Sequence, residues 1–209
     1  MKRLNPNLYL VTNSDNMKED NFLRTIAQAC EGGVTLVQLR EKNLTGREYY
    51  HLAIKVKSIT DKFNIPLIID DRVDIALAAD TAGVHLGQTD LPIAAARAIM
   101  GADKIIGATA KTVEQAKEAE DSGADYLGVG AIYPTKTKVI TVLTPVETLT
   151  DISKNVKIPV IAIGGLNAGN LSPLYGSGAD GIAVVSAIME STDPKATSEE
   201  LLQIIRSSL

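Results

Sequence analysis

The sequence predicts an α/β protein, a single (β/α)8 TIM barrel over residues 1–209 with its active site at the C-terminal ends of the strands. Strand-like runs alternate with helix-compatible segments along the whole chain, and glycine recurs before strands, as in TAGVHLG and SGADYLGVG. Apolar residues make up 45% of the chain but aromatic residues only 4%, a composition that suits parallel strands covered by helices. About eight such repeats match a closed barrel. A doubly wound open sheet is the alternative, because periodicity does not show closure.

Eight short aliphatic and β-branched runs predict the strands. They are Leu8–Thr12, Thr35–Arg40, Pro66–Asp70, Gly83–Leu86, Ile105–Ala108, Tyr126–Val129, Pro159–Ile163 and Gly181–Val185. Helix-compatible segments between them include Thr45–Phe63, Pro92–Met100, Thr112–Ser122 and Asn167–Ser177. Thr112 is placed as a helix N-cap, and Ser122-Gly123 is a typical helix end.

Composition excludes several classes of function. A net charge of −4 argues against nucleic acid as the main partner. No run approaches membrane-spanning length, and the start MKRLNPNLYLVTN lacks the apolar stretch of a signal peptide. The single Cys30 is interpreted as a buried, reduced thiol. We therefore expect a cytoplasmic protein with small-molecule partners, while the oligomeric state is not predicted.

The stretch TLVQLREKN places polar side chains on what otherwise reads as a buried strand. Strand side chains alternate between faces, so Gln38, Arg40 and Lys42 share one side and Val37 and Leu39 the other. Because a buried charge is costly without a partner, an anionic ligand is expected there. A solvated charged face is the ordinary alternative, but it fits poorly with the parity of Gln38 and Arg40.

Three aspartates follow neighbouring predicted strands. Asp70 and Asp71 end IIDD, and Asp90 ends HLGQTD. Oxygen ligands without nearby His or Cys suit Mg²⁺ better than zinc. The alternative is that Asp70 and Asp90 cap the helices that follow them.

The last two strands predict a second anionic subsite. IAIGGLNAGN places Gly164 and Gly165 after the seventh strand, and GIAVVSAIM places Ser186 at a helix start. Free backbone N–H groups and a helix dipole favour a phosphate, although the glycines could simply form tight turns. With Lys136 and Lys138 nearby, two anionic subsites suggest a reaction between two phosphorylated small molecules.

The motifs QLREK, DDRVDIAL, HLGQTD, GATA, YPTKTK, IGGL and VVSAI occur in this order over nearly the full chain. In these motifs the chain resembles the thiamine phosphate synthase family, also called thiamine-phosphate pyrophosphorylase. The resemblance implies a transferase that joins a hydroxymethylpyrimidine diphosphate to a thiazole phosphate. In that family Mg²⁺ assists the departure of pyrophosphate, and the thiazole nitrogen attacks the methylene carbon, so the resemblance implies the same steps here.

The resemblance also implies roles for individual residues. The catalytic residues are Arg40, Lys42 and Lys138. The residues that bind the pyrimidine diphosphate are Gln38, Arg40, Lys42, Asp70, Thr109 and Lys138. The residues that bind the thiazole phosphate are Thr135, Thr137, Gly165, Val185 and Ser186. The metal ligands are Asp71 and Asp90. Asp70 stands where the family usually has Asn, so it either joins the metal site or is neutralised by Arg72.

Two other functions compete with this one. A related barrel, a thiazole tautomerase, uses a histidine after the fifth strand, where this chain has Lys111. A barrel that only senses a thiamine precursor would not need a cluster of cations and metal ligands. His85 is interpreted as structural.

Overall fold

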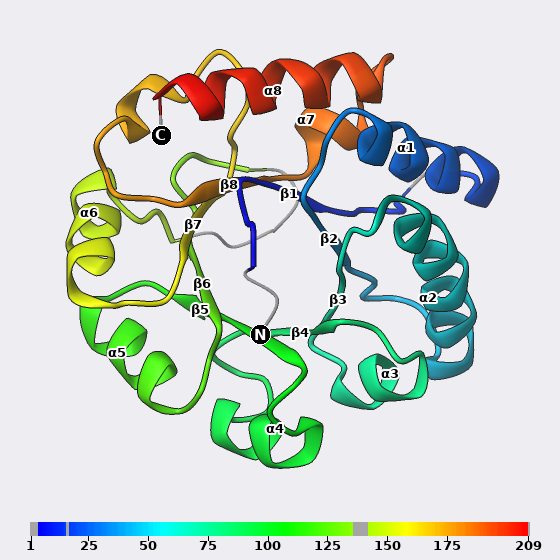
Figure 1. The fold of residues 1–209 in the computed structure, drawn as a ribbon, viewed down its shortest axis with the longest axis horizontal. Coiled ribbons are helices and arrows are strands. Elements are labelled where there is room, and N and C mark those ends of the chain that lie inside the picture. The colour runs from blue at the N-terminus through cyan, green and yellow to red at the C-terminus, as the bar shows by residue number, and fades with distance from the viewer. Residues whose placement is uncertain (1–3, 16, 136–141, 209) are drawn as a thin grey trace.

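The computed structural model describes residues 4–15, 17–135 and 142–208, and its eight strands form a closed parallel barrel in sequence order (Figure 1). The strands are β1 (Leu8–Val11), β2 (Leu36–Leu39), β3 (Leu67–Asp70), β4 (Gly83–Leu86), β5 (Ile105–Ala110), β6 (Tyr126–Gly130), β7 (Val160–Ile163) and β8 (Gly181–Val184). β1 pairs with β8, so the predicted closure is confirmed and the open sheet is excluded. All eight predicted strands are present, with ends that differ from the predicted ones by at most two residues.

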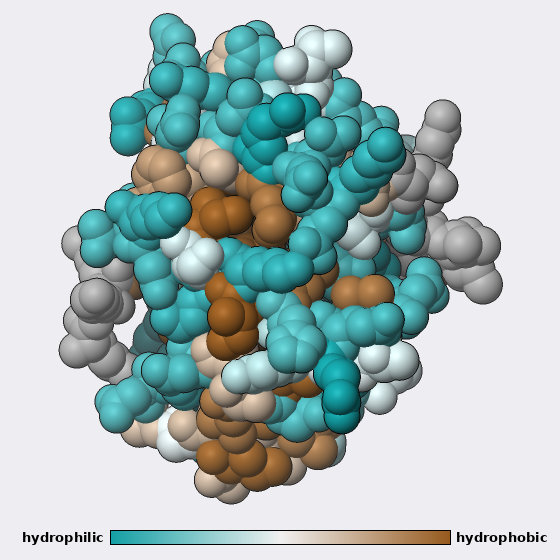
Figure 2. Space-filling view, turned by 90° about the vertical axis from the view of Figure 1, so that its right-hand side faces the viewer, coloured by the Kyte–Doolittle hydropathy of each residue, from teal (hydrophilic) through white to brown (hydrophobic). Residues whose placement is uncertain are grey.

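Helices surround the barrel in the view down its axis (Figure 1). They are α1 (Glu19–Glu31), α2 (Gly46–Thr60), α3 (Val73–Ala78), α4 (Ile93–Met100), α5 (Val113–Asp121), α6 (Val146–Asn155), α7 (Ser186–Met189) and α8 (Pro194–Ser208), with two 3-10 turns, η1 (Asp61–Phe63) and η2 (Ser172–Leu174). The surface over α1 to α3 is mainly hydrophilic, with apolar patches between (Figure 2).

Local signals explain several helix ends. Thr45 and Glu48 form a capping box at the start of α2, in which the Thr45 hydroxyl accepts from the Glu48 N–H. The Thr112 hydroxyl accepts from the Gln115 N–H, which confirms it as the N-cap of α5. Gly123 follows α5 with φ of 95°, a left-handed conformation suited to glycine.

The prediction of a helix over 167–177 is wrong, because this segment forms turns around η2. The Asn167 carboxamide accepts from the Gly169 N–H, and the Asn170 side chain accepts from the Asn167 N–H. Such side-chain bonds compete with helical backbone bonds. Gly176 and Gly178 then take positive φ values of 76° and 80°, which a helix cannot contain.

Strand side chains divide the core into two layers. The barrel interior holds a small cluster, made by Tyr9, Val11, Leu36, Ile68, Tyr126, Ile161 and Ala183. The opposite strand faces, including Val37 and Leu39, pack beneath the helices in a larger cluster. Gln38 follows the parity of Leu36 and is buried, so the predicted alternation along β2 is confirmed.

Candidate active site

Charged side chains from the ends of β2 and β3 meet at the C-terminal end of the barrel. Arg40 Nε lies 3.7 Å from Asp70 Oδ2, and Lys42 Nζ lies 2.7 Å from the same oxygen. Lys42 Nζ also contacts the carboxylate of Asp71. Arg40 and Asp71 are partly buried, whereas Lys42 is more exposed. The structure therefore brings these four predicted site residues into one ion-pair cluster.

Backbone contacts fix the strand ends that carry this cluster. The Tyr49 hydroxyl, buried on α2, donates to the Leu39 carbonyl at 2.6 Å, directly before Arg40. The Arg40 N–H donates to the Thr12 hydroxyl at 3.2 Å, which ties β2 to the end of β1. Asp71 turns the chain from β3 toward α3 with φ of 60°, a conformation that Asp tolerates better than β-branched residues do.

Asp70 is the most buried carboxylate of the cluster, with 8% of its surface exposed. Burial and the neighbouring Asp71 raise its pKa to about 6, although Lys42 and Arg40 oppose the shift. Neutralisation by Arg72, one expected alternative, is wrong because Arg72 Nε donates to Asp74 at 2.7 Å. Asp70 does not cap α3 either, since Arg72 occupies the N-cap position.

Asp71 and Asp90 form a pair of carboxylates across the ends of β3 and β4. Burial, together with the contact with Asp71, raises the pKa of Asp90, while the Gly87 N–H opposes this by donating to Asp90 Oδ2 at 2.7 Å. Asp90 therefore shapes its own loop and does not cap α4, whose N-cap is Pro92. Among the described residues no group of three or more His, Cys, Asp or Glu side chains could enclose a metal. Two carboxylates nonetheless fit Mg²⁺, which commonly takes one or two and completes its shell with water and phosphate.

A chain of hydrogen bonds crosses the barrel interior below this cluster. Gln38 Nε2 donates to the Tyr9 hydroxyl at 2.8 Å, and the Tyr9 and Tyr126 hydroxyls lie 2.8 Å apart. His85 Nδ1 lies 3.1 Å from the Tyr126 hydroxyl, and His85 Nε2 lies 3.0 Å from Thr109 Oγ1. Burial lowers the pKa of His85 to about 4, so the imidazole is neutral at neutral pH. The chain thus connects the two predicted ligand-binding residues Gln38 and Thr109.

The opposite side of the mouth is formed by the loops after β6, β7 and β8. Gly165 has φ of 67°, and a Cβ there would lie 2.8 Å from the Pro134 carbonyl oxygen, directly before Thr135. Ile163 is paired with Ala183, so Gly165 and Val185 follow the ends of the neighbouring strands β7 and β8. Ser186 is exposed and begins α7. Thr135, Gly165, Val185 and Ser186 therefore lie on one side of the barrel end, whereas Thr137 and Lys138 lie outside the described residues.

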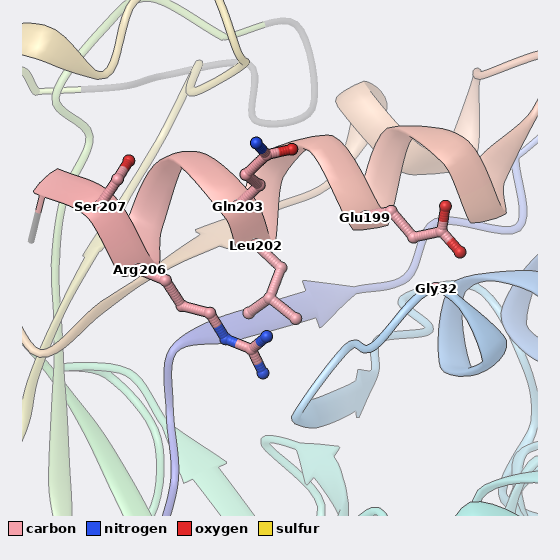
Figure 3. A pocket seen from close by; sticks show the side chains of 6 residues that line it. All are labelled: Gly32, Glu199, Leu202, Gln203, Arg206 and Ser207. Carbon is pink, nitrogen blue, oxygen red and sulfur yellow. The ribbon is translucent and has the colours of Figure 1, made fainter.

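A surface cavity of about 350 Å³ lies elsewhere, between the end of α1 and α8 (Figure 3). Its lining includes Gly32, Leu202 and Arg206, and none of the predicted site residues. Gly32 precedes β2, which places this cavity toward the opposite end of the strands. Its charged rim is ordinary helix surface, so the cavity does not replace the barrel mouth as the candidate site.

Sequence reasoning missed the tyrosines of the barrel interior. Tyr9 and Tyr126 share parity with inward-facing strand residues, and each is almost fully buried. A buried tyrosine usually finds a partner for its hydroxyl, so an inward tyrosine on a strand was the available signal. Tyr49, which holds the end of β2, gave no comparable signal because helices commonly bury aromatic residues.

The fold and the mouth define a class of protein: a (β/α)8-barrel enzyme with oxygen and cationic groups suited to phosphorylated substrates. A family model described as "Thiamine monophosphate synthase" matches residues 8–188. The chain belongs to this family, the thiamine-phosphate synthases, which are transferases that release pyrophosphate. The family resemblance, the fold and the activity predicted from the sequence are thereby confirmed.

Individual relatives cover nearly the whole chain. Thiamine-phosphate synthase 2 of Streptococcus pneumoniae is 51% identical over 97% of this chain and 96% of its own. Thiamine-phosphate synthase of Methanobrevibacter smithii is 51% identical over 97% of both chains. The solved thiamine phosphate pyrophosphorylase from Pyrococcus furiosus superposes with a TM-score of 0.89, at 40% identity over 98% of both chains. Within the part of this chain that is described, no helix combines the length and apolar content that crossing a membrane requires.

Proposed function

We propose that the mouth holds the two substrates of thiamine-phosphate synthesis on opposite sides. The β2–β5 side binds 4-amino-2-methyl-5-(diphosphooxymethyl)pyrimidine, and the β6–β8 side binds 4-methyl-5-(2-phosphooxyethyl)thiazole. The products are thiamine phosphate and pyrophosphate. The observation that carries this assignment is the convergence of Arg40 and Lys42 with three aspartates at one end of the barrel.

Arg40 and Lys42 stabilise the departing pyrophosphate. Negative charge grows on the leaving group as the C–O bond breaks, so fixed cations stabilise the transition state more than the bound substrate. Asp70 and Asp71 hold Lys42 in place before substrate arrives. Lys138 is proposed as a third cation of the same group. The attacking nitrogen loses no proton, so the reaction needs no general base.

Asp71 and Asp90 would hold Mg²⁺. When bound, the ion supplies positive charge beside the diphosphate oxygens. The support for this site is the close pair of carboxylates, whose oxygens are the donors that Mg²⁺ prefers. Gln38, Asp70 and Thr109 are proposed to bind the pyrimidine diphosphate beside this pair.

The thiazole phosphate is proposed to bind the loops after β6, β7 and β8. Gly165 permits close approach of an anion to the backbone, because it carries no side chain and has positive φ. Val185 and Ser186 add backbone N–H groups, while Thr135 and Thr137 add hydroxyls. We propose further that residues 1–209 act as one catalytic domain in the cytoplasm, without a nucleic-acid or membrane partner.

The test combines purified protein, both substrates and Mg²⁺, and measures pyrophosphate release. Product that requires all three components is expected, and its absence would count against the synthase activity. Arg40→Ala should slow turnover by about 10²-fold, the effect of losing one preorganised donor. The matched control is Arg24→Ala, which alters an exposed arginine on α1 and should leave turnover unchanged. Equal rates in the two variants would show that Arg40 has no role in turnover and is an ordinary solvated surface charge.

A further inference from the structure

The hydrogen-bond chain in the barrel interior has one consistent direction. The described residues offer the Tyr9 hydroxyl two partners, Gln38 Nε2 and the Tyr126 hydroxyl. Because Gln38 Nε2 can only donate, Tyr9 accepts from it and sends its own hydrogen to Tyr126. The reverse direction would leave the Tyr9 hydrogen buried without an acceptor among the described residues, which is costly.

This direction determines the tautomer of His85. Tyr126 already accepts from Tyr9, so its own hydrogen goes to His85 Nδ1, 3.1 Å away. A neutral imidazole has one donor and one acceptor, so its hydrogen lies on Nε2. Nε2–H then donates to Thr109 Oγ1 at 3.0 Å. Because Thr109 Oγ1 accepts from His85, its own hydroxyl hydrogen points away from His85.

The environment holds this arrangement rigidly. Tyr9 and Tyr126 are almost fully buried, and their rings meet edge to face with centroids 5.9 Å apart. A Cβ at Gly107 would lie 2.1 Å from the Tyr126 ring, and one at Gly128 would lie 3.2 Å from His85 Cε1. The glycines on β5 and β6 therefore leave space for these two rings and for little movement of either.

We propose that Tyr126 and His85 are positioning residues, which fix Thr109 as a hydrogen-bond donor toward an acceptor atom of the pyrimidine diphosphate. This inference rests on the proposed function, because it requires that substrate to lie against Thr109. Without this hydrogen-bond chain, the Thr109 hydroxyl could also donate to His85 Nε2. It would then present only lone pairs to the substrate. The hydrogen-bond chain thus selects the one orientation of the Thr109 hydroxyl in which it can donate to an acceptor on the substrate.

The first test reads the tautomer in the free protein by ¹⁵N NMR of histidine-labelled samples. The chain contains two histidines, so His51→Gln assigns the His85 signals directly. The wild-type protein should show one Nε2–H tautomer, and Tyr126→Phe should show a mixture. A mixed tautomer in the wild type, or an unchanged one in Tyr126→Phe, overturns the directed chain.

The second test measures KM for each substrate separately. Tyr126→Phe should raise KM for the pyrimidine diphosphate about tenfold, the effect of one hydrogen bond, and leave KM for the thiazole phosphate unchanged. In a Thr109→Val background the same change should add nothing, because its effect passes through the missing hydroxyl. Tyr175→Phe, which alters an exposed tyrosine, is the matched control. Equal rises for both substrates, or additive effects with Thr109→Val, overturn the positioning role.

A pair of histidine variants covers the case in which Tyr126→Phe does not fold. His85→Gln can place an amide N–H where Nε2–H stands, so KM should stay within about threefold, whereas His85→Leu should show the full loss. Equal KM values in the two variants overturn the proposal. Wild-type protein that forms no thiamine phosphate would overturn the proposed function alone, and the NMR measurement would still decide the direction of the chain.

Discussion

Asp70→Asn should make the metal-free protein more stable at pH 7.5. Burial raises the pKa of Asp70 to about 6 from an ordinary value of 3.8, so the folded state holds this proton more tightly than the unfolded state does. Between these two values the folded state binds more protons, and stability therefore falls as the pH rises. Asparagine has nearly the same shape and never acquires the charge.

The magnitude follows from the two pKa values. Their difference corresponds to at most about 3 kcal/mol at pH 7.5 and about 1 kcal/mol at pH 4.5. The raised pKa already includes the attraction of Lys42 and Arg40, so losing those contacts is not an additional cost. For a chain of this size, the gain at pH 7.5 would raise Tm by roughly 6–12 °C.

The assay is urea unfolding followed by circular dichroism, with EDTA and without substrates, at pH 4.5 and 7.5. Asp74→Asn is the matched control, because Asp74 is exposed and Arg72 lowers its pKa. Removing that carboxylate should give no gain at pH 7.5. A lower urea midpoint for Asp70→Asn at pH 7.5, or the same gain at both pH values, would refute the reasoning.

Three further results are expected. Asp71→Ala should lose most activity, and a titration with excess Mg²⁺ should restore only part of it; full activity would remove Asp71 from the metal site. Gly176→Ala should lose about 1 kcal/mol in urea unfolding from its positive φ, and Gly165→Ala should lose more, because a Cβ there would also lie 2.8 Å from the Pro134 carbonyl oxygen. Only Gly165→Ala should raise KM for the thiazole phosphate, because a Cβ at Gly176 meets nothing within 4 Å. Burial raises the pKa of Cys30 to about 12, so a thiol reagent at pH 8 should label it only after unfolding; rapid labelling of the native protein would contradict its burial.

The barrel could be predicted because each repeat carries its own local signals. Alternating strand and helix patterns, the Thr112 N-cap and the Gly123 helix end all act within a few residues of one another. The segment over 167–177 was misjudged for the same reason. Its apolar spacing suits a helix, but hydrogen bonds from the side chains of Asn167 and Asn170 form turns instead.

The contacts within the site were harder to predict because they join distant parts of the chain. Arg72 was a reasonable partner for Asp70 from spacing alone, yet it pairs with Asp74, which is two residues away and exposed to solvent. The partners of Asp70 directly follow β2, and only the register between β2 and β3 brings them together. The contact between Tyr9 and Tyr126 spans 117 positions, so it exists only after the barrel closes.

The charges at the mouth explain why a cation and a diphosphate should bind together. Among the described residues, Arg40 and Lys42 face three carboxylates, those of Asp70, Asp71 and Asp90. Burial and this surplus of negative charge raise the pKa values of Asp70 and Asp90. A diphosphate alone would add to the surplus, and a divalent ion alone would lack the phosphate oxygens that complete its shell. At the proposed site each ligand would therefore strengthen the binding of the other by the same factor, and neither is expected to bind tightly by itself.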